Sequence, residues 1–198
     1  MTGNGKEREM VKIIGIVGSP RKGGNTELLT KEALQAASAE GAETELITLA
    51  GKEIKPCDGC RQCKDKKIDC HIQDDLAPIF HKLLEADGLI LATPVYVGSA
   101  TAQTKAFMDR VCFWSGALGR PLENKVGAPL VVARRAGQNF TFAQLFFFFF
   151  LAGMIVPGTT YWGIAFGKEK GEVANDEEGI NTARNLGKKI AWLAKKLQ

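Results

Sequence analysis

Apolar segments of strand length alternate with segments of helical periodicity along this chain. Four mainly apolar segments predict β-strands over residues 11–18, 88–93, 126–133 and 159–165, and the alternating segment ETELITL predicts another over residues 43–49. Apolar side chains at helical spacing predict helices over residues 26–40, 74–84, 104–113, 140–151 and 180–197. Strands that alternate with helices form a parallel sheet with right-handed crossovers and helices on both faces. We therefore predict an α/β fold with a doubly wound, five-stranded parallel sheet.

The length and composition are those of one globular domain. The chain has 198 residues, of which 45% are hydrophobic and 24% are charged. Residues 11–198 contain no linker and no internal repeat, so we expect a single domain over this range. Residues 1–10 are polar and are expected to form a disordered tail.

Neither a membrane protein nor a nucleic-acid-binding protein is indicated. The longest apolar run, residues 145–156, is well short of the roughly 20 residues that cross a bilayer. The polar N-terminal segment does not resemble an export signal, so we expect a cytoplasmic protein. The net charge of +4 is scattered among 22 acidic residues, which gives little support to nucleic-acid binding.

The loop after the first strand has the composition of an anion site. Residues 18–26 read GSPRKGGNT, and the glycines allow backbone N–H groups to converge at the start of the next helix. Ser19, Asn25 and Thr26 add side-chain donors. The loop matches neither the triphosphate-binding pattern nor the dinucleotide fingerprint, so it suits a terminal phosphate monoester. The alternative is an ordinary glycine-rich turn.

Two further strand-end loops are candidates for the same site, because a doubly wound sheet binds its ligand at the carboxyl ends of its strands. In the loop after the third strand, Tyr96 could lie against a flat ring, and Gly98 allows close approach. Packing is the alternative role for Tyr96. Arg134 and Arg135 follow the fourth strand and could contact an electron-rich ring edge or a substrate anion. A solvated surface loop is the alternative there.

Four of the five cysteines lie within one short segment. The spacing is C-x2-C-x2-C-x6-C, at Cys57, Cys60, Cys63 and Cys70. Without an export signal, such a group indicates metal or redox chemistry before disulfides. The tight triplet favours an iron-sulfur cluster over structural zinc, and thiols without metal are a third interpretation. His71 would be a ligand only in a zinc site. Cys112, in an apolar helix, is expected to be a packing residue.

Three segments of the chain resemble the flavodoxin-like NAD(P)H-dependent FMN reductase superfamily, and within it the iron-sulfur flavoproteins. They are GSPRKGGNTELL, TPVYVGSATAQTKAFMDR and the cysteine segment between them. The resemblance implies a flavodoxin-like fold that binds FMN. It assigns the FMN phosphate to Ser19, Arg21, Asn25 and Thr26. It assigns the isoalloxazine ring to Pro94, Val95, Tyr96, Gly98 and Ser99. Arg134, in the less similar third loop, is a further candidate for cofactor binding.

The resemblance also implies a [4Fe–4S] cluster on Cys57, Cys60, Cys63 and Cys70, in an insert over residues 55–73. FMN takes up two electrons, whereas a cluster moves one. Such a protein exchanges electrons between a ferredoxin-like donor or NAD(P)H and a small-molecule acceptor. The alternatives are an NAD(P)H-dependent FMN or quinone reductase without a cluster, and a passive flavodoxin-like carrier.

Residues 146–150 are five consecutive phenylalanines in a predicted helix. At about 100° per residue they sweep around the whole helix, so some rings must point away from the sheet. A second subunit would cover those rings, which predicts a homodimer or a homotetramer. The alternative is a deeply buried segment that is partly a strand.

Overall fold

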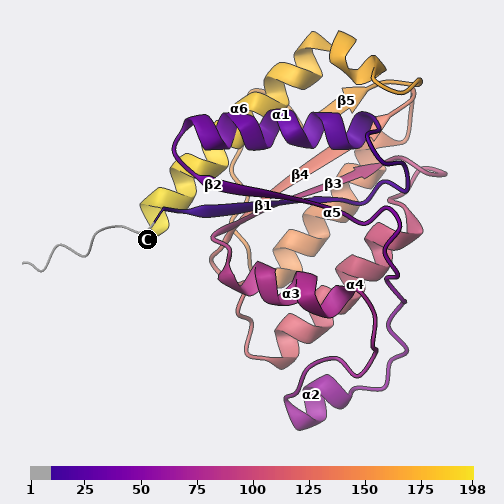
Figure 1. Cartoon of the computed structure of the whole chain (residues 1–198), viewed down its shortest axis with the longest axis vertical. Helices are drawn as coiled ribbons and strands as arrows, with labels where there is room; N and C mark the ends of the chain where they lie inside the picture. Colours follow the sequence, from indigo (N-terminus) through magenta and orange to yellow (C-terminus); the bar gives the residue numbers. More distant parts are fainter. Residues whose placement is uncertain (1–9) are drawn as a thin grey trace, which may run out of the picture.

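A computed structural model describes residues 10–198, which fold around one five-stranded sheet (Figure 1). The strand order is β2-β1-β3-β4-β5, and all neighbouring strands are parallel. The chain therefore winds outward from β1 in both directions, and the predicted fold class is confirmed. The strands are β1 (Lys12–Val17), β2 (Glu43–Thr48), β3 (Gly88–Pro94), β4 (Val126–Ala133) and β5 (Ile164–Phe166).

The fifth strand is shorter and later than the sequence predicts. Instead of residues 159–165, only Ile164–Phe166 pairs with β4. The Ile164 N–H donates to the carbonyl of Trp162 at 2.7 Å, a tight turn that sets the chain direction just before the strand. Tyr161 and Trp162 are exposed in the preceding loop. Their aromatic character raised the strand propensity of a segment that has no partner strand.

Helices cover both faces of the sheet, as predicted. In Figure 1, α1 and α6 lie above the sheet and α3, α4 and α5 lie below it. The α4 helix begins two residues earlier than predicted, because the Thr101 hydroxyl accepts a hydrogen bond from the Thr104 N–H and caps it. The helices are α1 (Asn25–Ala39), α2 (Gln62–Lys66), α3 (Leu76–Glu85), α4 (Ala102–Ala117), α5 (Gln138–Ala152) and α6 (Glu177–Leu197), with a 3-10 helix over Glu172–Asn175.

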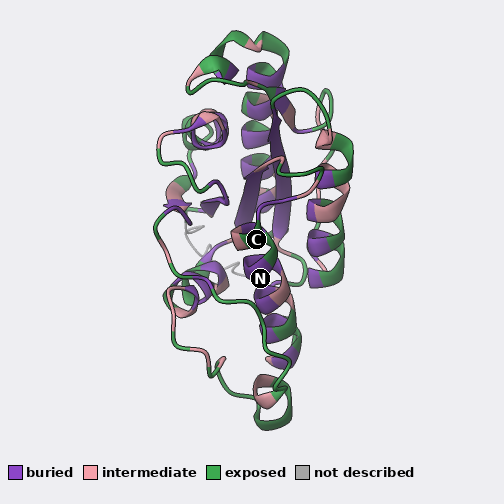
Figure 2. Ribbon diagram, turned by 90° about the vertical axis from the view of Figure 1, so that its right-hand side faces the viewer, coloured by how far each residue is buried: buried purple, intermediate pink, exposed green. Residues whose placement is uncertain are grey.

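Each face of the sheet has its own hydrophobic core (Figure 2). Successive residues of a strand point to opposite faces, so Ile13 packs with α1 and α6 while Ile14 packs with α3 and α4. All eight residues of β4 are buried. Burial on both sides explains why β1, β3 and β4 are almost continuously apolar in sequence, whereas β2, at the edge of the sheet, alternates between polar and apolar residues.

The cysteine insert extends beyond these layers. Residues 55–73 reach to the lower end of the molecule in Figures 1 and 2, where the short α2 has no buried residue. The sequence did not predict this helix, which is flanked by Arg61 and Lys67 with left-handed backbone conformation. The insert is thus an exposed appendage held at its two ends.

The phenylalanine run divides between core and surface. Phe148 and Phe149 are buried, whereas Phe147 and Phe150 are 70% and 80% exposed. The whole run lies in α5, so the expectation that some rings point away from the sheet is confirmed and the fully buried alternative is wrong.

The predicted disordered tail, residues 1–10, lies outside the described residues except for Met10. Within residues 10–198, no helix has both the length and the hydrophobicity that a bilayer span requires.

Candidate functional site

A cavity of about 360 Å³ opens at the carboxyl ends of the central strands. It is the position at which a doubly wound sheet binds its ligand. Eight of the ten cofactor-binding residues predicted from the sequence line it, while Gly98 and Ser99 do not. The lining residues are Ser19, Arg21, Gly24, Asn25, Thr26, Pro94, Val95, Tyr96, Val132, Arg134, Gly167, Lys168, Glu169 and Lys170.

The first loop wraps the start of α1. Ser19 and Thr26 are buried at the floor of the loop, and the Ser19 Oγ accepts a hydrogen bond from the Arg21 N–H at 3.2 Å. The Gly23 N–H donates to Glu27 Oε2 at 2.7 Å, so this amide is already engaged. The Lys31 ammonium and the Gly23 N–H hold the pKa of the Glu27 carboxyl below its usual value, although burial opposes them. Anion binding therefore falls to the remaining amides and to the cations around the loop.

A buried network of threonine hydroxyls joins the first loop to the second. The Thr101 Oγ1 donates to the carbonyl of Gly18 at 2.6 Å and lies 2.8 Å from the Thr104 Oγ1. Thr104 in turn contacts the Thr93 hydroxyl at 3.1 Å. All three side chains are buried. This network was not predicted from the sequence, although three threonines lie within twelve positions of one strand-loop-helix segment.

The second loop is a tight turn over residues 96–99. Tyr96 and Ser99 exchange backbone hydrogen bonds at 2.8 and 3.0 Å, and Val97 and Gly98 both have positive φ. The Ser99 Oγ donates to Gln144 Oε1 on α5 at 3.0 Å, so this side chain faces the helix and not the cavity. Tyr96 lies half exposed at the mouth of the cavity.

A fourth loop, over residues 167–170 after β5, completes the cavity. Asn25 holds it: its Oδ1 accepts from the Gly171 N–H at 2.7 Å, and its Nδ2 donates to the Glu169 carbonyl at 2.8 Å. The Asn25 carboxamide, predicted as a donor to the ligand, is therefore committed to protein contacts. The sequence GKEKG, directly after the fifth strand, could have predicted this fourth loop as part of the site.

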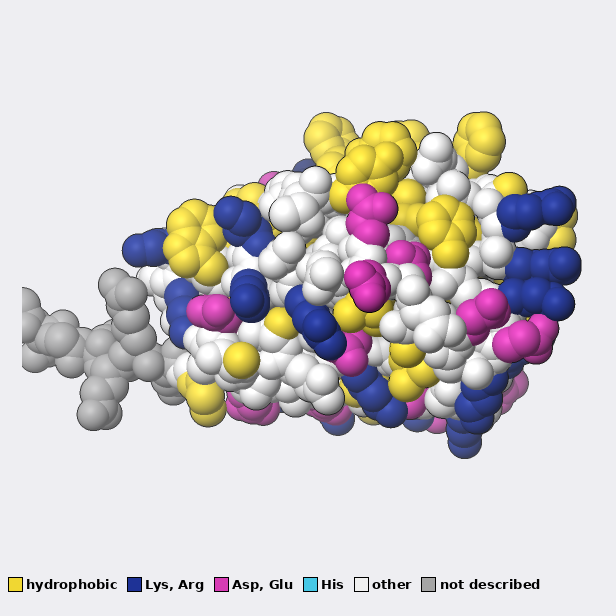
Figure 3. Space-filling model, turned by 90° about the horizontal axis from the view of Figure 1, so that it is seen from above, with side chains coloured by type: hydrophobic (Ala, Val, Ile, Leu, Met, Phe, Trp, Pro, Cys, Tyr) yellow, Lys and Arg dark blue, Asp and Glu magenta, His cyan; other side chains and the backbone are white. Residues whose placement is uncertain are grey.

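Positive charge surrounds the cavity. The fourth loop adds Lys168 and Lys170 to the predicted Arg21 and Arg134. Figure 3 shows Lys and Arg side chains gathered at its right-hand end, the end at which the strands finish in Figure 1. The cavity thus combines cations, free amides and a half-exposed aromatic ring, which suits a phosphorylated aromatic ligand.

The four clustered cysteines line a second cavity of about 270 Å³, which shares no lining residue with the first. All four thiols are free, and the exposed Phe113 from α4 borders the cavity. Burial and the neighbouring Cys70 and Cys57 raise the pKa of the Cys63 thiol, against an opposing backbone N–H. A cation bound among the sulfurs would offset this mutual repulsion of thiolates.

The distances between the cysteine sulfurs show whether one zinc ion could bind several of them at once. One zinc ion with Zn–S bonds of about 2.3 Å would hold tetrahedral sulfurs about 3.8 Å apart. Within residues 10–198, no three cysteine sulfurs lie within 4.8 Å of one another. The group that meets this distance is the exposed set Asp58, Cys60 and His71, in which the His71 Nε2 lies 2.8 Å from Asp58 Oδ2. The four sulfurs thus do not form a preformed single-zinc site, whereas Asp58, Cys60 and His71, which line the same cavity, lie at the spacing of ligands to one metal ion.

Cys112 is expected to react much more slowly than an ordinary thiol. It does not line the cysteine cavity, and burial raises the pKa of its thiol to about 11. Near neutral pH its thiolate fraction is then about 300-fold below that of an exposed thiol with a pKa of about 8.5. A short pulse of iodoacetamide on the metal-free protein, mapped by mass spectrometry, measures this. Complete labelling of Cys112 within the pulse would contradict the packing role.

Residues 11–169 match a family model described as NADPH-dependent FMN reductase. An iron-sulfur flavoprotein of Methanocaldococcus jannaschii is 47% identical over 192 residues, which cover 93% of this chain and 98% of that protein. An iron-sulfur flavoprotein of Methanosarcina thermophila is 37% identical over 195 residues, covering 95% and 97% of the two chains. These matches extend over both cavities.

Solved structures show the same fold. The structure of the Trp repressor binding protein from Bacillus subtilis superimposes with a TM-score of 0.65 at 25% sequence identity, covering 88% of this chain and 99% of that one. A flavone reductase gives a TM-score of 0.69 at 23% identity, covering 93% of this chain and 63% of that chain. The similarity to these structures concerns the sheet and its helices.

Proposed function

Because this chain belongs to the NADPH-dependent FMN reductase family, and within it to the iron-sulfur flavoproteins, it is an FMN-dependent oxidoreductase, and we propose that its cysteine insert carries a [4Fe–4S] cluster. One observation carries the proposal: the side chains of Cys57, Cys60, Cys63 and Cys70 line a single cavity. Four thiolates are the usual ligand set of such a cluster.

The strand-end cavity is the proposed FMN site. Its volume of about 360 Å³ is in the range of small-ligand sites. The amides at the start of α1, together with Arg21, Lys168 and Lys170, would hold the phosphate. Tyr96, half exposed at the mouth, would lie beside the ring and leave one edge open to a reaction partner.

The two proposed sites would have different roles in electron transfer. When bound, FMN exchanges electrons singly or in pairs, and a cluster exchanges them one at a time. Cys57 and Cys60 are exposed at the surface of the insert, so a ferredoxin-like donor protein can approach this site directly. The open mouth of the flavin cavity would admit NAD(P)H or a small-molecule acceptor. We propose electron exchange between a donor of either kind and such an acceptor.

Anaerobic purification followed by iron, acid-labile sulfide and FMN analysis tests the proposal. We expect one FMN and about four iron and four sulfide per chain, with a broad absorption near 400 nm that bleaches on reduction. Stoichiometric zinc, or no metal after anaerobic reconstitution with iron and sulfide, would overturn the cluster. In that case the cluster-free NAD(P)H-dependent FMN or quinone reductase becomes the better proposal, and NAD(P)H oxidation with a quinone would test it.

We further propose that the chain forms a homodimer or a homotetramer through the exposed face of α4 and α5. A hollow of about 540 Å³ between these helices is lined by Phe113, Phe147 and Leu151, all largely exposed. Apolar surface of this kind is uncommon on a monomer. Phe147→Glu should therefore yield monomers at micromolar concentration, measured by size exclusion with light scattering.

The matched control is Trp192→Glu, which changes a similarly exposed aromatic residue on α6, on the other face of the sheet. This variant should keep the assembly of the wild type. A wild-type protein that is monomeric at micromolar concentration would refute the proposed association.

A further inference from the structure

Arg110, on α4, carries a fully buried guanidinium that the proposed electron transfer does not use. Only 1% of its side chain is exposed, and it forms an ion pair with Asp74, whose side chain is fully buried. Burying two charges costs several kcal/mol unless they are paired and further hydrogen-bonded.

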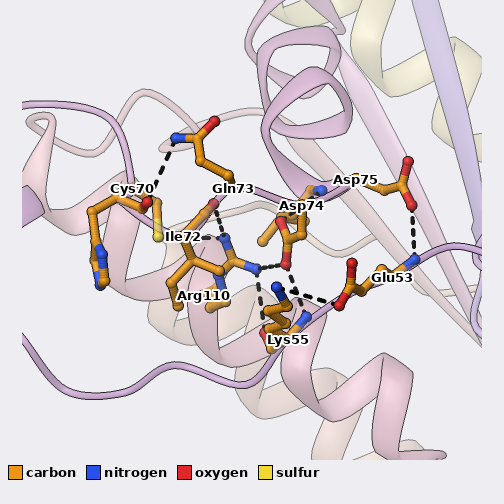
Figure 4. A network of polar contacts seen from close by, with 10 residues as sticks. Glu53, Lys55, Cys70, Ile72, Gln73, Asp74, Asp75 and Arg110 are labelled. Atoms are coloured by element: carbon orange, nitrogen blue, oxygen red, sulfur yellow. Dashed lines mark hydrogen bonds and ion pairs between the residues drawn. The ribbon is translucent and has the colours of Figure 1, made fainter.

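The guanidinium contacts both ends of the cysteine insert (Figure 4). Its Nη1 donates to the carbonyl of Lys55 at 3.2 Å, just before the first cysteine. Its Nη2 donates to the carbonyl of Ile72 at 3.4 Å, just after the last cysteine. The same Nη2 donates to the Sγ of Cys70 at 3.3 Å. One side chain from α4 therefore joins the core of the domain, the two ends of the insert and one of its sulfurs.

Carboxylates close the neck of the insert from the same side. The Asp74 Oδ2 accepts from the Lys55 N–H at 2.9 Å, and the Asp75 Oδ2 accepts from the Glu53 N–H at 2.7 Å. Although burial opposes them, Arg110 and the backbone N–H groups of Lys55 and Leu76 hold the pKa of the Asp74 carboxyl below its usual value. The neck is thus a charged network that stays intact near neutral pH, and Arg110 is at its centre.

Lys125 and Arg110 both bind backbone carbonyls, but of these two cations Arg110 is the one that also contacts a cysteine sulfur. Lys125 is a partly buried cation, but its Nζ donates to the carbonyls of Leu83, Leu84 and Ala86 and so caps the end of α3. Arg110 does more, because its planar fork reaches Asp74 and Cys70 with different nitrogens. This reach leaves its buried Nε without a partner. Arg110 makes these two contacts from two separate nitrogens, whereas a lysine ammonium has one.

We propose that Arg110 is a positioning residue that fixes Cys70 in the cysteine cavity, and that its charged hydrogen bond to Sγ raises the reduction potential of the cluster. The second part rests on the proposed function. A cationic donor at a ligand sulfur stabilises the more negative, reduced state of a cluster. Arg110 would thereby set how readily the cluster accepts an electron.

Arg110→Lys is the test, because lysine keeps the charge beside Asp74 but has one nitrogen. In the metal-free protein, the neck amides of Lys55 and Glu53 should exchange with deuterium about tenfold faster, as expected for the loss of one charge-assisted hydrogen bond. In the reconstituted protein, an EPR-monitored titration should give a lower cluster potential than in the wild type. If Arg110→Lys does not fold, Arg110→Met combined with Asp74→Asn removes both charges and should lower the potential too.

Lys125→Met is the matched control: it removes a partly buried cation away from the insert and should leave the neck exchange and the potential unchanged. An unchanged potential in Arg110→Lys would overturn the role toward the cluster, and unchanged neck exchange would overturn the anchoring. A wild type without iron would refute the proposed function and, with it, the role toward the cluster. The exchange data would then still decide the anchoring.

Discussion

Gly18→Ala is expected to cost about 3 kcal/mol of folding stability and to weaken FMN binding at least about tenfold. A Cβ on Gly18 would collide with the Thr104 hydroxyl, and would also lie 3.2 Å from the carbonyl of Ala92. Thr104 cannot move aside cheaply, because its hydroxyl belongs to the buried network with Thr93 and Thr101. The first loop would shift as a unit, and its amides would leave the proposed phosphate site.

Urea denaturation of the apoprotein measures the stability, and quenching of flavin fluorescence measures the FMN affinity. Gly116→Ala is the matched control, since a Cβ there meets no atom within 4 Å and lies inside α4. It should leave FMN binding unchanged and raise the stability by about 0.5–1 kcal/mol. Equal FMN affinity in the two variants would show that the first loop does not hold the phosphate.

Cys60→Ala should lower the iron content from about four per chain to nearly none while FMN stays bound. The physical reason is that the two cavities share no lining residue and Cys60 is exposed, so its loss removes a ligand without disturbing the core. Flavin reduction by reduced ferredoxin should then be lost in stopped-flow measurements. Reduction of the flavin by dithionite should continue.

Cys112→Ala is the control for loss of a thiol outside the cysteine cavity, and it should keep both the iron and the ferredoxin reaction. Equal rates of flavin reduction by ferredoxin in the wild type and Cys60→Ala would show that the cluster takes no part in this electron transfer. That result would favour the cluster-free reductase. Loss of FMN from Cys60→Ala would instead show that the two sites depend on each other.

The order of strands and helices was predictable because burial on both faces leaves a local pattern. The β4 strand reads as an uninterrupted apolar run since each of its residues is buried. The spacing of the clustered cysteines likewise predicted that they belong together, and all four line one cavity. The glycine-rich loop after β1 was predicted as a ligand site from its position in the sheet and its composition, and Ser19, Arg21 and Thr26 of this loop line the strand-end cavity.

The errors came from contacts between distant parts of the chain. The aromatic residues before Ile164 suggested a strand, but a strand needs a neighbour, and only Ile164–Phe166 has one on β4. Asn25 looked like a ligand donor in its own loop, yet it bonds Gly171, 146 positions away. No local pattern could have shown either fact.

The sequence by itself determined the sheet, the helices that cover it, the two groups of candidate ligands and the family. The tertiary structure decided how those groups are held: Thr101 bonds Gly18 across 83 positions, and Arg110 bonds Cys70 across 40. Periodicity and composition report the environment of each residue, because burial acts on residues one at a time. A buried hydrogen bond needs two specific partners, and which residues meet depends on the packing of the whole chain.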